Sequence, residues 1–236
     1  MESGISVVLL AYKEAENLNV LIPKIMEEVE KTNEKYEIVV IDTKTPMDNT
    51  SEVCEKYGAR YTNQELPGFG GAYCKAISEA RYDKILALDS DGSHKPEHIP
   101  AMYQLFTQGY DVVIGSRYVK GGSTSDAKSS QVMSKILNTV FRICLGLKAK
   151  DLSTNYRFYR TEVVKQIHLD GVNYDVLEEI LLKMKLLVGK NFRIGEVPIQ
   201  FVKRNFGESK RRLLPFIWSY IKTLFRLIFI RIRGKA

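Results

Sequence analysis

The sequence has few of the residues that build disulfide frameworks or histidine-rich metal sites. Only three of its 236 residues are cysteines, namely Cys54, Cys74 and Cys144. They are odd in number, widely spaced and in no pair motif, which argues against a disulfide framework and favours free thiols in a reducing compartment. Histidine is equally scarce. His94 and His98 have the spacing of a metal-binding pair, but Pro96 lies between them, so we expect the exposed start of a helix there.

Internal repeats, low-complexity segments and nucleic-acid-binding motifs are also absent. The chain is 44% apolar and 27% charged, as in ordinary globular proteins, and it is long enough for one large α/β domain or two small ones. The net charge of +7 is unevenly distributed. No acidic residue follows Glu208, whereas the basic residues after it are Lys210, Arg211, Arg212, Lys222, Arg226, Arg231, Arg233 and Lys235. Because these alternate with Leu, Ile and Phe, they do not predict nucleic-acid binding.

Short apolar stretches alternate with helical patterns over the first half of the chain. The predicted strands are 5–12, 36–42, 84–89 and 110–116, with a weaker one at 59–63. The predicted helices between them are 18–29, 50–58, 70–80 and 96–109. This alternation predicts an α/β fold with a doubly wound, mostly parallel sheet. The elements expected after residue 120 are a mobile loop at 121–130, helices at 131–147 and 174–189, and an extended strand at 192–204.

Two acids end one of the predicted strands. Asp89 and Asp91 follow the apolar residues 85–88, with Ser90 between them. Ligands of open parallel sheets collect at the carboxyl ends of the strands, and neighbouring carboxylates repel unless a cation lies between them. Mg²⁺ or Mn²⁺, which can also hold substrate phosphates, suits this position. A solvated turn, in which Asp91 or Ser93 caps the next helix, is the alternative.

Seven stretches in the same order and at plausible spacing carry a resemblance to a known family. They are residues 7–18, 36–42, 68–73, 87–100, 112–122, 151–160 and 194–210. Through them the chain resembles the inverting, nucleotide-sugar-binding family-2 glycosyltransferases. Within that family it is most similar to the dolichyl-phosphate mannose synthases and their polyprenyl-phosphate relatives. The resemblance implies a glycosyltransferase A fold, with residues 1–210 as the catalytic domain.

The resemblance also implies a role for each candidate site residue. The residues expected to bind the nucleotide sugar are Ala11, Tyr12, Glu14, Asp42, Gly70, Asp89, Ser90 and Asp91. Those expected to bind Mg²⁺ or Mn²⁺ are Asp89, Asp91 and Ser93. Those expected around the acceptor phosphate are Arg117, Lys135, Arg204 and Lys210, with Arg157 adding charge. The expected catalytic residues are Asp91, Arg117 and Arg204. The glycines around Gly70 would uncover backbone amides near the nucleotide.

The implied reaction transfers a hexose, mannose from GDP-mannose, to a polyprenyl (dolichyl) phosphate with inversion. The acceptor phosphate is already an anion, so it needs alignment and charge relief rather than a general base. Thr43 and Lys44 depart from the family pattern near the nucleoside base, which keeps UDP-glucose and UDP-GlcNAc open as donors. On the acceptor side, residues 134–138 and Asn155 depart from it.

Two rival functions stay open. Transfer to a hydroxyl of a glycan would need a carboxylate base, but we expect the candidates Glu178 and Glu179 on the solvent face of their helix. A non-catalytic membrane-binding module with the same fold is the rival from another class. The presence of Asp89, Asp91 and Arg117 speaks against this second rival.

The basic tail, residues 211–236, mixes arginines with large apolar residues. Its longest uncharged stretch is Leu213–Ile221, whereas a membrane-spanning helix needs about 20 residues. We therefore expect an amphipathic helix that lies on a membrane. The residues expected on its basic face are Lys222, Arg226 and Arg233. Those expected at the lipid headgroups are Trp218, Phe225 and Phe229.

Such a tail would make the protein peripheral to a membrane. We expect it on the cytoplasmic face of a plasma membrane in a prokaryote, or of the endoplasmic reticulum in a eukaryote. Two alternatives compete with lipid contact. The tail can pack on the catalytic domain as its last helix, or it can dock on a small membrane-embedded partner subunit.

Overall fold

Strands and helices alternate along the chain as the sequence predicts. The computed structural model describes residues 1–204 and 213–234. Its strands are β1 (Glu2–Leu10), β2 (Tyr36–Asp42), β3 (Arg60–Asn63), β4 (Tyr82–Asp89), β5 (Val112–Ser116), β6 (Ser123–Thr124), β7 (Arg157–Arg160), β8 (Ile194–Pro198) and β9 (Gln200–Phe201). Its helices are α1 (Ala15–Glu30), α2 (Thr50–Lys56), α3 (Gly68–Glu79), α4 (Ile99–Phe106), α5 (Lys128–Leu145), α6 (Thr161–Val164), α7 (Val176–Val188) and α8 (Leu213–Arg233). Two 3-10 turns, η1 (Pro96–His98) and η2 (Gly189–Asn191), complete the set described.

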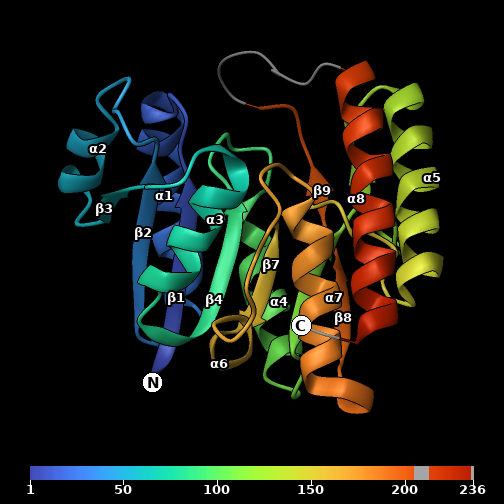
Figure 1. Ribbon diagram of the computed structural model, residues 1–236. Helices are drawn as coiled ribbons and strands as arrows, with labels where there is room; N and C mark the ends of the chain where they lie inside the picture. The colour runs from blue at the N-terminus through green and yellow to red at the C-terminus, as the bar shows by residue number, and fades with distance from the viewer. Residues whose placement is uncertain (205–212, 235–236) are drawn as a thin grey trace.

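A seven-stranded sheet with the order β3-β2-β1-β4-β7-β5-β8 forms the centre of the molecule (Figure 1). Only β7 runs against its neighbours, pairing antiparallel with both β4 and β5, while the other pairings in this sheet are parallel. The carboxyl ends of the parallel strands therefore meet at one edge of the sheet, which we call the rim. Because β7 runs the other way, residues 151–156 that precede it lie at the same rim.

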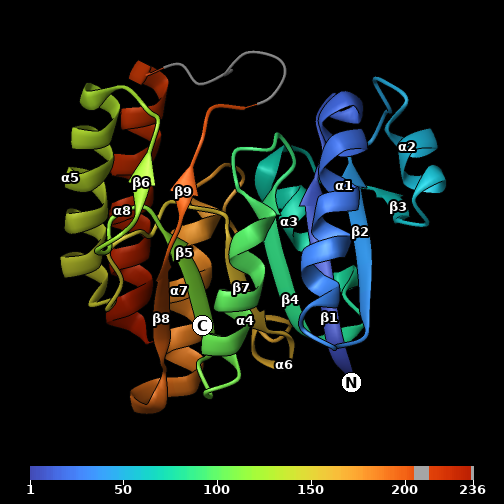
Figure 2. The same cartoon turned by 180° about the vertical axis from the view of Figure 1, so that it is seen from behind.

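Helices cover both faces of the sheet. Figure 1 shows α3 and α7 in front of it, and Figure 2, from behind, shows α1 and α4 on the other face. The apolar positions that predicted α1 point into the core, since Leu18, Ile22, Ile25 and Val29 are all buried. The predicted doubly wound, mostly parallel architecture is thus confirmed. Burial of apolar side chains on both faces also explains why β1, β2 and β4 are continuous apolar runs.

Helices α5 and α8 lie side by side at the β8 end of the sheet (Figures 1 and 2). On the inner side of α8, Leu227 is buried and the Tyr220 ring lies 5.8 Å from the Phe141 ring of α5. Arg226 also points inward, where its Nη2 donates to Glu179 at 2.9 Å and to Asp175 at 3.1 Å. The expectation that Arg226 belongs to an exposed basic face is therefore wrong. The Trp218 side chain lies outside the described residues.

Two segments after residue 116 differ from the sequence prediction. The expected loop at 121–130 contains β6, and α5 already begins at Lys128. The expected strand at 192–204 is divided, because β8 joins the main sheet while β9 pairs with β6 in a separate two-stranded sheet. The Ser123 N–H donates to the Ile199 carbonyl and the Ser125 N–H to the Phe201 carbonyl, both at 2.9 Å. This pairing fixes the polar segment across the rim.

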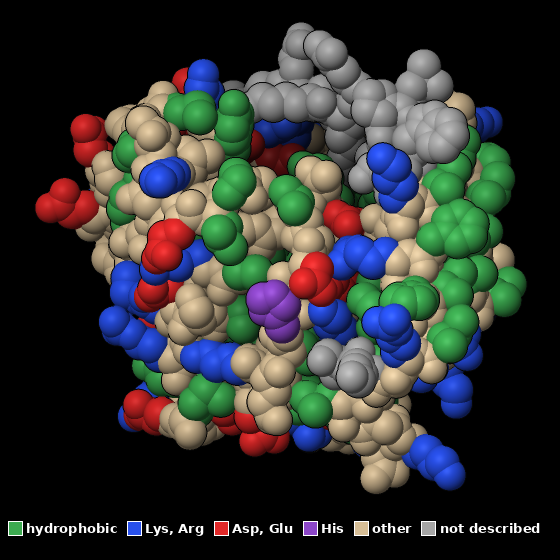
Figure 3. Space-filling model, in the orientation of Figure 1, with side chains coloured by type: hydrophobic (Ala, Val, Ile, Leu, Met, Phe, Trp, Pro, Cys, Tyr) green, Lys and Arg blue, Asp and Glu red, His purple; other side chains and the backbone are tan. Residues whose placement is uncertain are grey.

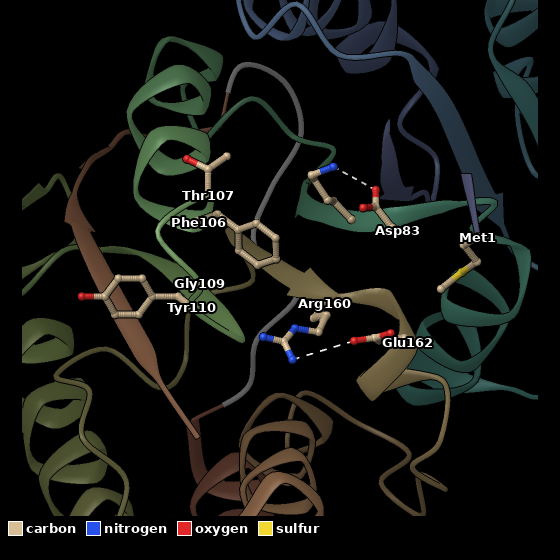
Figure 4. Close-up of a pocket in the computed structure, with 9 residues that line it drawn as sticks. Met1, Asp83, Phe106, Thr107, Gly109, Tyr110, Arg160 and Glu162 are labelled. Carbon is tan, nitrogen blue, oxygen red and sulfur yellow. Dashed lines mark hydrogen bonds and ion pairs between the residues drawn. The ribbon is translucent and has the colours of Figure 1, made fainter. Parts of the chain in front are cut away.

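A cavity lies away from the rim, at the opposite end of β4. It has a volume of about 400 Å³. Its lining includes Met1, Asp83, Phe106, Tyr110 and Arg160 (Figure 4). One of the dashed contacts in that view joins Arg160 to Glu162, an exposed ion pair at 3.8 Å. None of the described residues that the sequence assigns to donor, metal or acceptor lines this cavity.

The glycines at the start of α3 are required by packing. A Cβ on Gly70 would lie 1.8 Å from the Gly171 carbonyl oxygen, and one on Gly71 would lie 2.1 Å from the Leu66 carbonyl oxygen. The Gly70 N–H is already used, since it donates to the Val172 carbonyl at 2.9 Å. These glycines therefore seat the 171–172 segment against α3, and Gly70 does not present the free amide that the sequence analysis expected near the nucleotide.

We expect Gly70→Ala to destabilise the fold by about 2 kcal/mol, because the added methyl group forces the 171–172 backbone away from α3. Urea unfolding followed by circular dichroism measures the loss. Ser78→Ala, at an exposed position of the same helix, is the matched control and should change stability by under roughly 0.5 kcal/mol. Equal stabilities for both variants would contradict the packing role.

Candidate active site

The two acids that follow β4 stand at the rim. Asp91 shapes the turn, because its Oδ1 accepts from the Ser93 N–H at 3.0 Å and from the Ser93 hydroxyl at 2.6 Å. The Ser90 hydroxyl faces inward and donates to the Leu10 carbonyl at 2.8 Å, so it ties the turn to β1. The Asp89 and Asp91 side chains are 28% and 24% exposed. Both carboxylates are thus partly open to a ligand at the rim.

Asp89 is held from the side by the segment before β7. The Asn155 amide donates to Asp89 Oδ1 at 3.1 Å. His94 Nδ1 accepts the Asp89 backbone N–H at 3.0 Å, while its Nε2 lies 3.2 Å from the Thr154 hydroxyl. His94 is buried, and this burial lowers its pKa, so the ring is neutral. The expectation that His94 lies at an exposed helix start is wrong. A hydrogen bond to a backbone amide gives this imidazole a structural role that its spacing from His98 did not suggest.

Carboxylate and hydroxyl oxygens in this arrangement suit a hard divalent cation. Mg²⁺ is commonly held by one or two carboxylates while substrate phosphates and water fill its other positions. Within residues 1–204 and 213–234, no group of three or more His, Cys, Asp or Glu side chains is placed to hold a metal ion. Asp89 and Asp91 therefore fit a cation that is completed by the donor diphosphate, rather than a metal site built by protein alone.

Arg117 follows β5 at the same rim and is buried against Asp151. Its Nε and Nη2 donate to the two Asp151 oxygens, both at 2.7 Å, and Nη2 also donates to the Ser153 hydroxyl at 2.9 Å. Burial opposes the charge on Arg117, but the hydrogen bonds to Asp151 raise its pKa. The fork of the guanidinium is occupied by Asp151, and its Nη1 lies 3.9 Å from the Asp126 carboxylate. Phe201 packs on one face of the group, with its ring centroid 5.4 Å away.

Arg204 lies beside the acids rather than beside Arg117. Its Nη2 donates to Glu14 Oε1 at 2.8 Å, and its Nε is 4.0 Å from Asp91 Oδ2. Burial raises the pKa of Glu14, although Asn17 and Arg204 both act in the other direction. An arginine, Glu14 and Asp91 thus converge at one point of the rim. Arg204, which the sequence assigned to the acceptor phosphate, thus lies beside residues that the sequence assigned to the nucleotide sugar.

The remaining residues predicted to bind the donor are spread along the β1–β2 part of the rim. Ala11 is buried directly after β1, and Tyr12 is exposed. Asp42 is buried at the end of β2, where its Oδ1 accepts the Thr43 N–H at 2.7 Å and its Oδ2 accepts the Tyr61 hydroxyl at 2.9 Å. The Asp42 carboxylate is therefore already satisfied within the protein.

The other residues predicted around the acceptor phosphate lie in different places. Arg117 lines a small cavity, whereas Lys135 lies on the exposed side of α5 with its Nζ 5.6 Å from the Tyr118 ring. Arg157 is completely buried below the rim. Lys210 lies outside the described residues.

The cavity beside Arg117 gathers groups that sequence analysis did not combine. It has a volume of about 30 Å³, and its lining is Arg117, Ser134, Leu137, Asn138, Ser153, Tyr174, Glu178 and Tyr220. We call it the rim pocket. Asn138 is fixed there, since its Oδ1 accepts the Leu152 N–H at 2.8 Å. Its residues come from α5, α7 and α8 and from the segments that follow β5, precede β7 and precede α7. Most of these are distant in sequence, so spacing along the chain could not reveal the pocket.

The α7 acids are buried, and the expectation of a solvent-facing pair is wrong. Glu179 accepts the Asp170 and Gly171 N–H groups at 2.9 and 2.8 Å and pairs with Lys183 and Arg226. Glu178 lines the rim pocket, and burial raises its pKa to about 8.

Known proteins resemble this chain in both sequence and fold. Residues 6–168 match the description of glycosyl transferase family 2. The chain belongs to this family. It is therefore a glycosyltransferase, and the resemblance that the sequence motifs carried is confirmed. The fold agrees: glucosyl-3-phosphoglycerate synthase from Mycobacterium tuberculosis, crystallised with Mn²⁺, UDP and glucosyl-3-phosphoglycerate, superposes with a TM-score of 0.71. That match has 19% sequence identity and covers 97% of this chain and 80% of the other.

Several curated relatives act on lipid phosphates according to their names. The chain is 33% identical over 232 residues to a dolichol-phosphate mannosyltransferase of Pyrococcus furiosus, which covers 95% of this chain but only 63% of that protein's length. It is 32% identical to an undecaprenyl-phosphate mannosyltransferase of Micrococcus luteus, covering 86% of this chain and 85% of the relative. It is 31% identical to a polyprenol monophosphomannose synthase of Mycolicibacterium smegmatis, covering 86% and 79%.

We expect Asp151→Asn to destabilise the protein by about 3 kcal/mol, because it leaves the buried Arg117 guanidinium without its countercharge. Urea unfolding gives the change in the free energy of unfolding. Asp126→Asn is the matched control, since the Asp126 carboxylate is only partly buried and lies 3.9 Å from Arg117 Nη1. It should cost under roughly 1 kcal/mol. A loss no larger than the control's would show that the Arg117–Asp151 pair does not support the rim.

Proposed function

We propose that this chain transfers mannose from GDP-mannose to a polyprenyl phosphate and inverts the anomeric carbon. The observation that carries the proposal is the rim, where partly exposed Asp89 and Asp91 share a hydrogen-bonded segment with buried Arg117. Residues 151–155 join the two, because Asp151 holds Arg117 and Asn155 holds Asp89. The names of the three mannosyltransferase relatives support this choice of sugar and acceptor.

On the donor side, we assign the diphosphate to the acids at the end of β4. Asp89 and Asp91 would hold Mg²⁺ or Mn²⁺, and the cation when bound offsets negative charge on the leaving nucleoside diphosphate. Arg204 supplies a second positive charge beside Asp91. The nucleoside would lie along the ends of β1 and β2, near Tyr12 and Asp42. GDP is proposed from the mannosyltransferase relatives, and UDP remains the alternative because solved neighbours contain it.

On the acceptor side, we assign the phosphate to the rim pocket. Arg117 lines it, and hydroxyl or amide donors come from Ser134, Ser153 and Asn138. Arginine and neutral donors together bind phosphate oxygens well. Leu137 and Tyr220, which line the same pocket, give the first apolar atoms of the lipid a place to lie.

The reaction then needs little more than alignment. A phosphate oxygen of the acceptor attacks the anomeric carbon while the bond from that carbon to the diphosphate oxygen breaks. The electron pair of this bond leaves with the nucleoside diphosphate. Attack from the opposite side inverts the centre and gives a β-linked lipid phosphosugar from an α-linked donor. No proton is removed, so no general base is required.

The two rival functions have less support. A glycan hydroxyl needs a base, and Glu178, the carboxyl group in the rim pocket, keeps its proton at neutral pH because burial raises its pKa to about 8. A non-catalytic module has no need for Asp89 and Arg117 to be held by the same buried segment. Docking on a membrane-embedded partner subunit is a variant of the lipid proposal rather than a different reaction.

A paired helix surface suits an enzyme whose acceptor stays in a bilayer. We call this surface the α5–α8 face. Its exposed apolar residues are Val132, Met133, Ile136, Val140 and Ile143 of α5 and Ile221, Phe225, Phe229 and Ile232 of α8. Phe225 and Ile232 are 68% and 77% exposed. In Figure 3 apolar and basic side chains gather together over this edge of the molecule.

We propose that the α5–α8 face lies on an anionic membrane. Apolar side chains in contact with the acyl boundary and cations such as Lys222 and Arg233 near the headgroups are the features of helices that bind in this way. None of the described helices is long and apolar enough to cross a membrane. The inner side of α8 packs on the domain, so the tail is both the last helix of the fold and the proposed contact with lipid. The division into residues 1–210 and 211–236 then separates functions rather than folding units.

The membrane proposal predicts that Phe225→Ser combined with Phe229→Ser weakens binding to vesicles of phosphatidylglycerol and phosphatidylcholine by roughly tenfold or more, since two exposed rings no longer enter the lipid. Sedimentation with vesicles measures the bound fraction. Leu187→Ser, an exposed apolar position of α7, is the matched control. Unchanged binding of the double variant would refute the proposal that the α5–α8 face contacts the membrane.

The functional proposal predicts that GDP-mannose, among labelled GDP- and UDP-sugars, transfers its sugar to a polyprenyl phosphate in the presence of Mg²⁺ or Mn²⁺. Extraction of the lipid phase measures the product. Asp91→Ala should lower transfer by roughly a hundredfold or more, because the leaving diphosphate loses its charge compensation, while the folded structure persists.

Asp83→Ala is the control for this variant, because Asp83 lies at the opposite end of β4. Near-normal transfer by Asp91→Ala would refute the metal assignment. If labelled lipid formed only from a UDP-sugar, the donor would be that UDP-sugar and not GDP-mannose. If labelled glycan formed in place of labelled lipid, the acceptor would be a glycan and not a polyprenyl phosphate.

A further inference from the structure

One carboxyl group in the rim pocket has no function in the reaction as described. Glu178 of α7 is 1% exposed and lines the pocket together with Arg117. Within the described part of the chain, its Oε2 atom has no hydrogen-bond partner. A buried polar atom without a partner costs free energy, and in a native protein it calls for an explanation. A pocket that binds a hydrogen-bond acceptor provides one.

A fully buried arginine lies close by. Arg157 donates to the Leu177 and Leu152 carbonyls and to the Tyr159 hydroxyl. No carboxylate of the described residues comes within ion-pair distance of it. Glu178 is the carboxyl group whose charge acts on Arg157, and Arg157 in turn favours the ionised form of Glu178. Burial outweighs this attraction and keeps Glu178 protonated, so the charge of Arg157 persists beneath the rim pocket.

The other charged groups that we consider around Glu178 come from the rim, from α7 and the residue before it, and from α8. Asp151 at the rim and Asp175 at the start of α7 both disfavour its ionisation. Arg117 lies across the pocket, with its charge balanced by Asp151. Arg226 of α8 is balanced by Asp175 and Glu179. The neutral acid that lines the pocket, Glu178, therefore interacts with one buried positive charge outside the lining, that of Arg157, which has no carboxylate partner among the described residues.

We propose that Glu178 is a positioning residue for the acceptor: its uncharged carboxyl group donates an O–H hydrogen bond from Oε2 to an oxygen of the phosphate held by Arg117. This proposal rests on the proposed function, since it names a further contact for the same acceptor. When Glu178 loses its proton, it cancels the charge of Arg157 and repels the phosphate. Acceptor binding then requires one proton on Glu178, and that proton stays on the carboxyl group throughout transfer.

The requirement gives a pH dependence with a defined sign. Glu178 in the free protein loses its proton near pH 8, so binding of a phosphate dianion should weaken as the pH rises through that value. One linked proton predicts roughly a tenfold weaker affinity at pH 9 than at pH 7. A phosphate monoester is already mostly dianionic above pH 7, so its own titration adds little to the change.

The experiment measures binding of a short, water-soluble prenyl phosphate by calorimetry between about pH 7 and pH 9.5, a range set by the titration of Glu178. The protein is the full chain without donor. Glu178→Gln keeps the shape and an N–H donor but cannot ionise, so its affinity should not change with pH over this range. Glu162→Gln, which alters an exposed acid far from the pocket, should behave as the wild type. Inorganic phosphate and the prenyl alcohol test whether phosphate and lipid are both recognised.

A second measurement needs no variant. Titration of the wild type near pH 8 in buffers of different ionisation enthalpy counts protons taken up on binding, and uptake of a substantial fraction of one proton is expected. The role of Glu178 would be overturned if binding weakened with pH equally in the wild type and in Glu178→Gln, or if the wild type took up no proton on binding. Either result would leave the proposed function intact. Failure of the wild type to bind prenyl phosphate at any pH would refute the acceptor assignment and this inference with it. Loss of transfer in Glu178→Gln with unchanged prenyl phosphate binding would instead favour a general base and a hydroxyl acceptor.

Discussion

The hydrogen-bonded pair of Arg117 with Asp151 is the interaction on which the rest of the rim depends. It joins the end of β5 to the segment before β7, and that segment then reaches Asp89 through Asn155 and His94 through Thr154. The pair is buried, so its two charges attract with little screening by water, and separating them would leave a cation inside the protein. One ion pair thus helps to fix the position of Asp89, which we propose for the donor side, relative to Arg117, which we propose for the acceptor side.

The antiparallel strand β7 makes this connection possible. In a wholly parallel sheet, the segment before a strand lies at the end opposite to the ligand site. Because β7 runs against β4 and β5, its preceding residues reach the carboxyl ends of its neighbours. The same reversal places Arg157 at the beginning of β7, close below the rim. Charges of both signs therefore gather at one edge of the sheet without any pair of them being adjacent in sequence.

Helices α5, α7 and α8 extend the site beyond the sheet. Their side chains line the rim pocket beside Arg117, while the outer sides of α5 and α8 carry exposed apolar residues. A substrate with a charged head and an apolar tail would find partners for both along this path. The ion pairs that partly buried Arg226 forms with Asp175 and Glu179 hold α8 to α7 and so support both the pocket and the α5–α8 face.

The sequence alone was enough to predict the order of strands and helices, from the periodicity of its apolar residues, and a site at the rim, from the two acids at a strand end. Local patterns suffice for the alternation of strands and helices, for the buried face of α1, and for the position of Asp89 and Asp91 at a strand end, because each depends on neighbours within a few residues. Seven motifs in order were enough for the family. What only the tertiary structure decided depends on contacts between distant segments. Burial of Glu178 and His94, the packing role of Gly70, the inward turn of Arg226 and the partner of Arg117 all arise where segments up to a hundred residues apart meet. The charge and the accessibility of a side chain depend on these contacts between distant segments, so a pattern within one segment does not predict them.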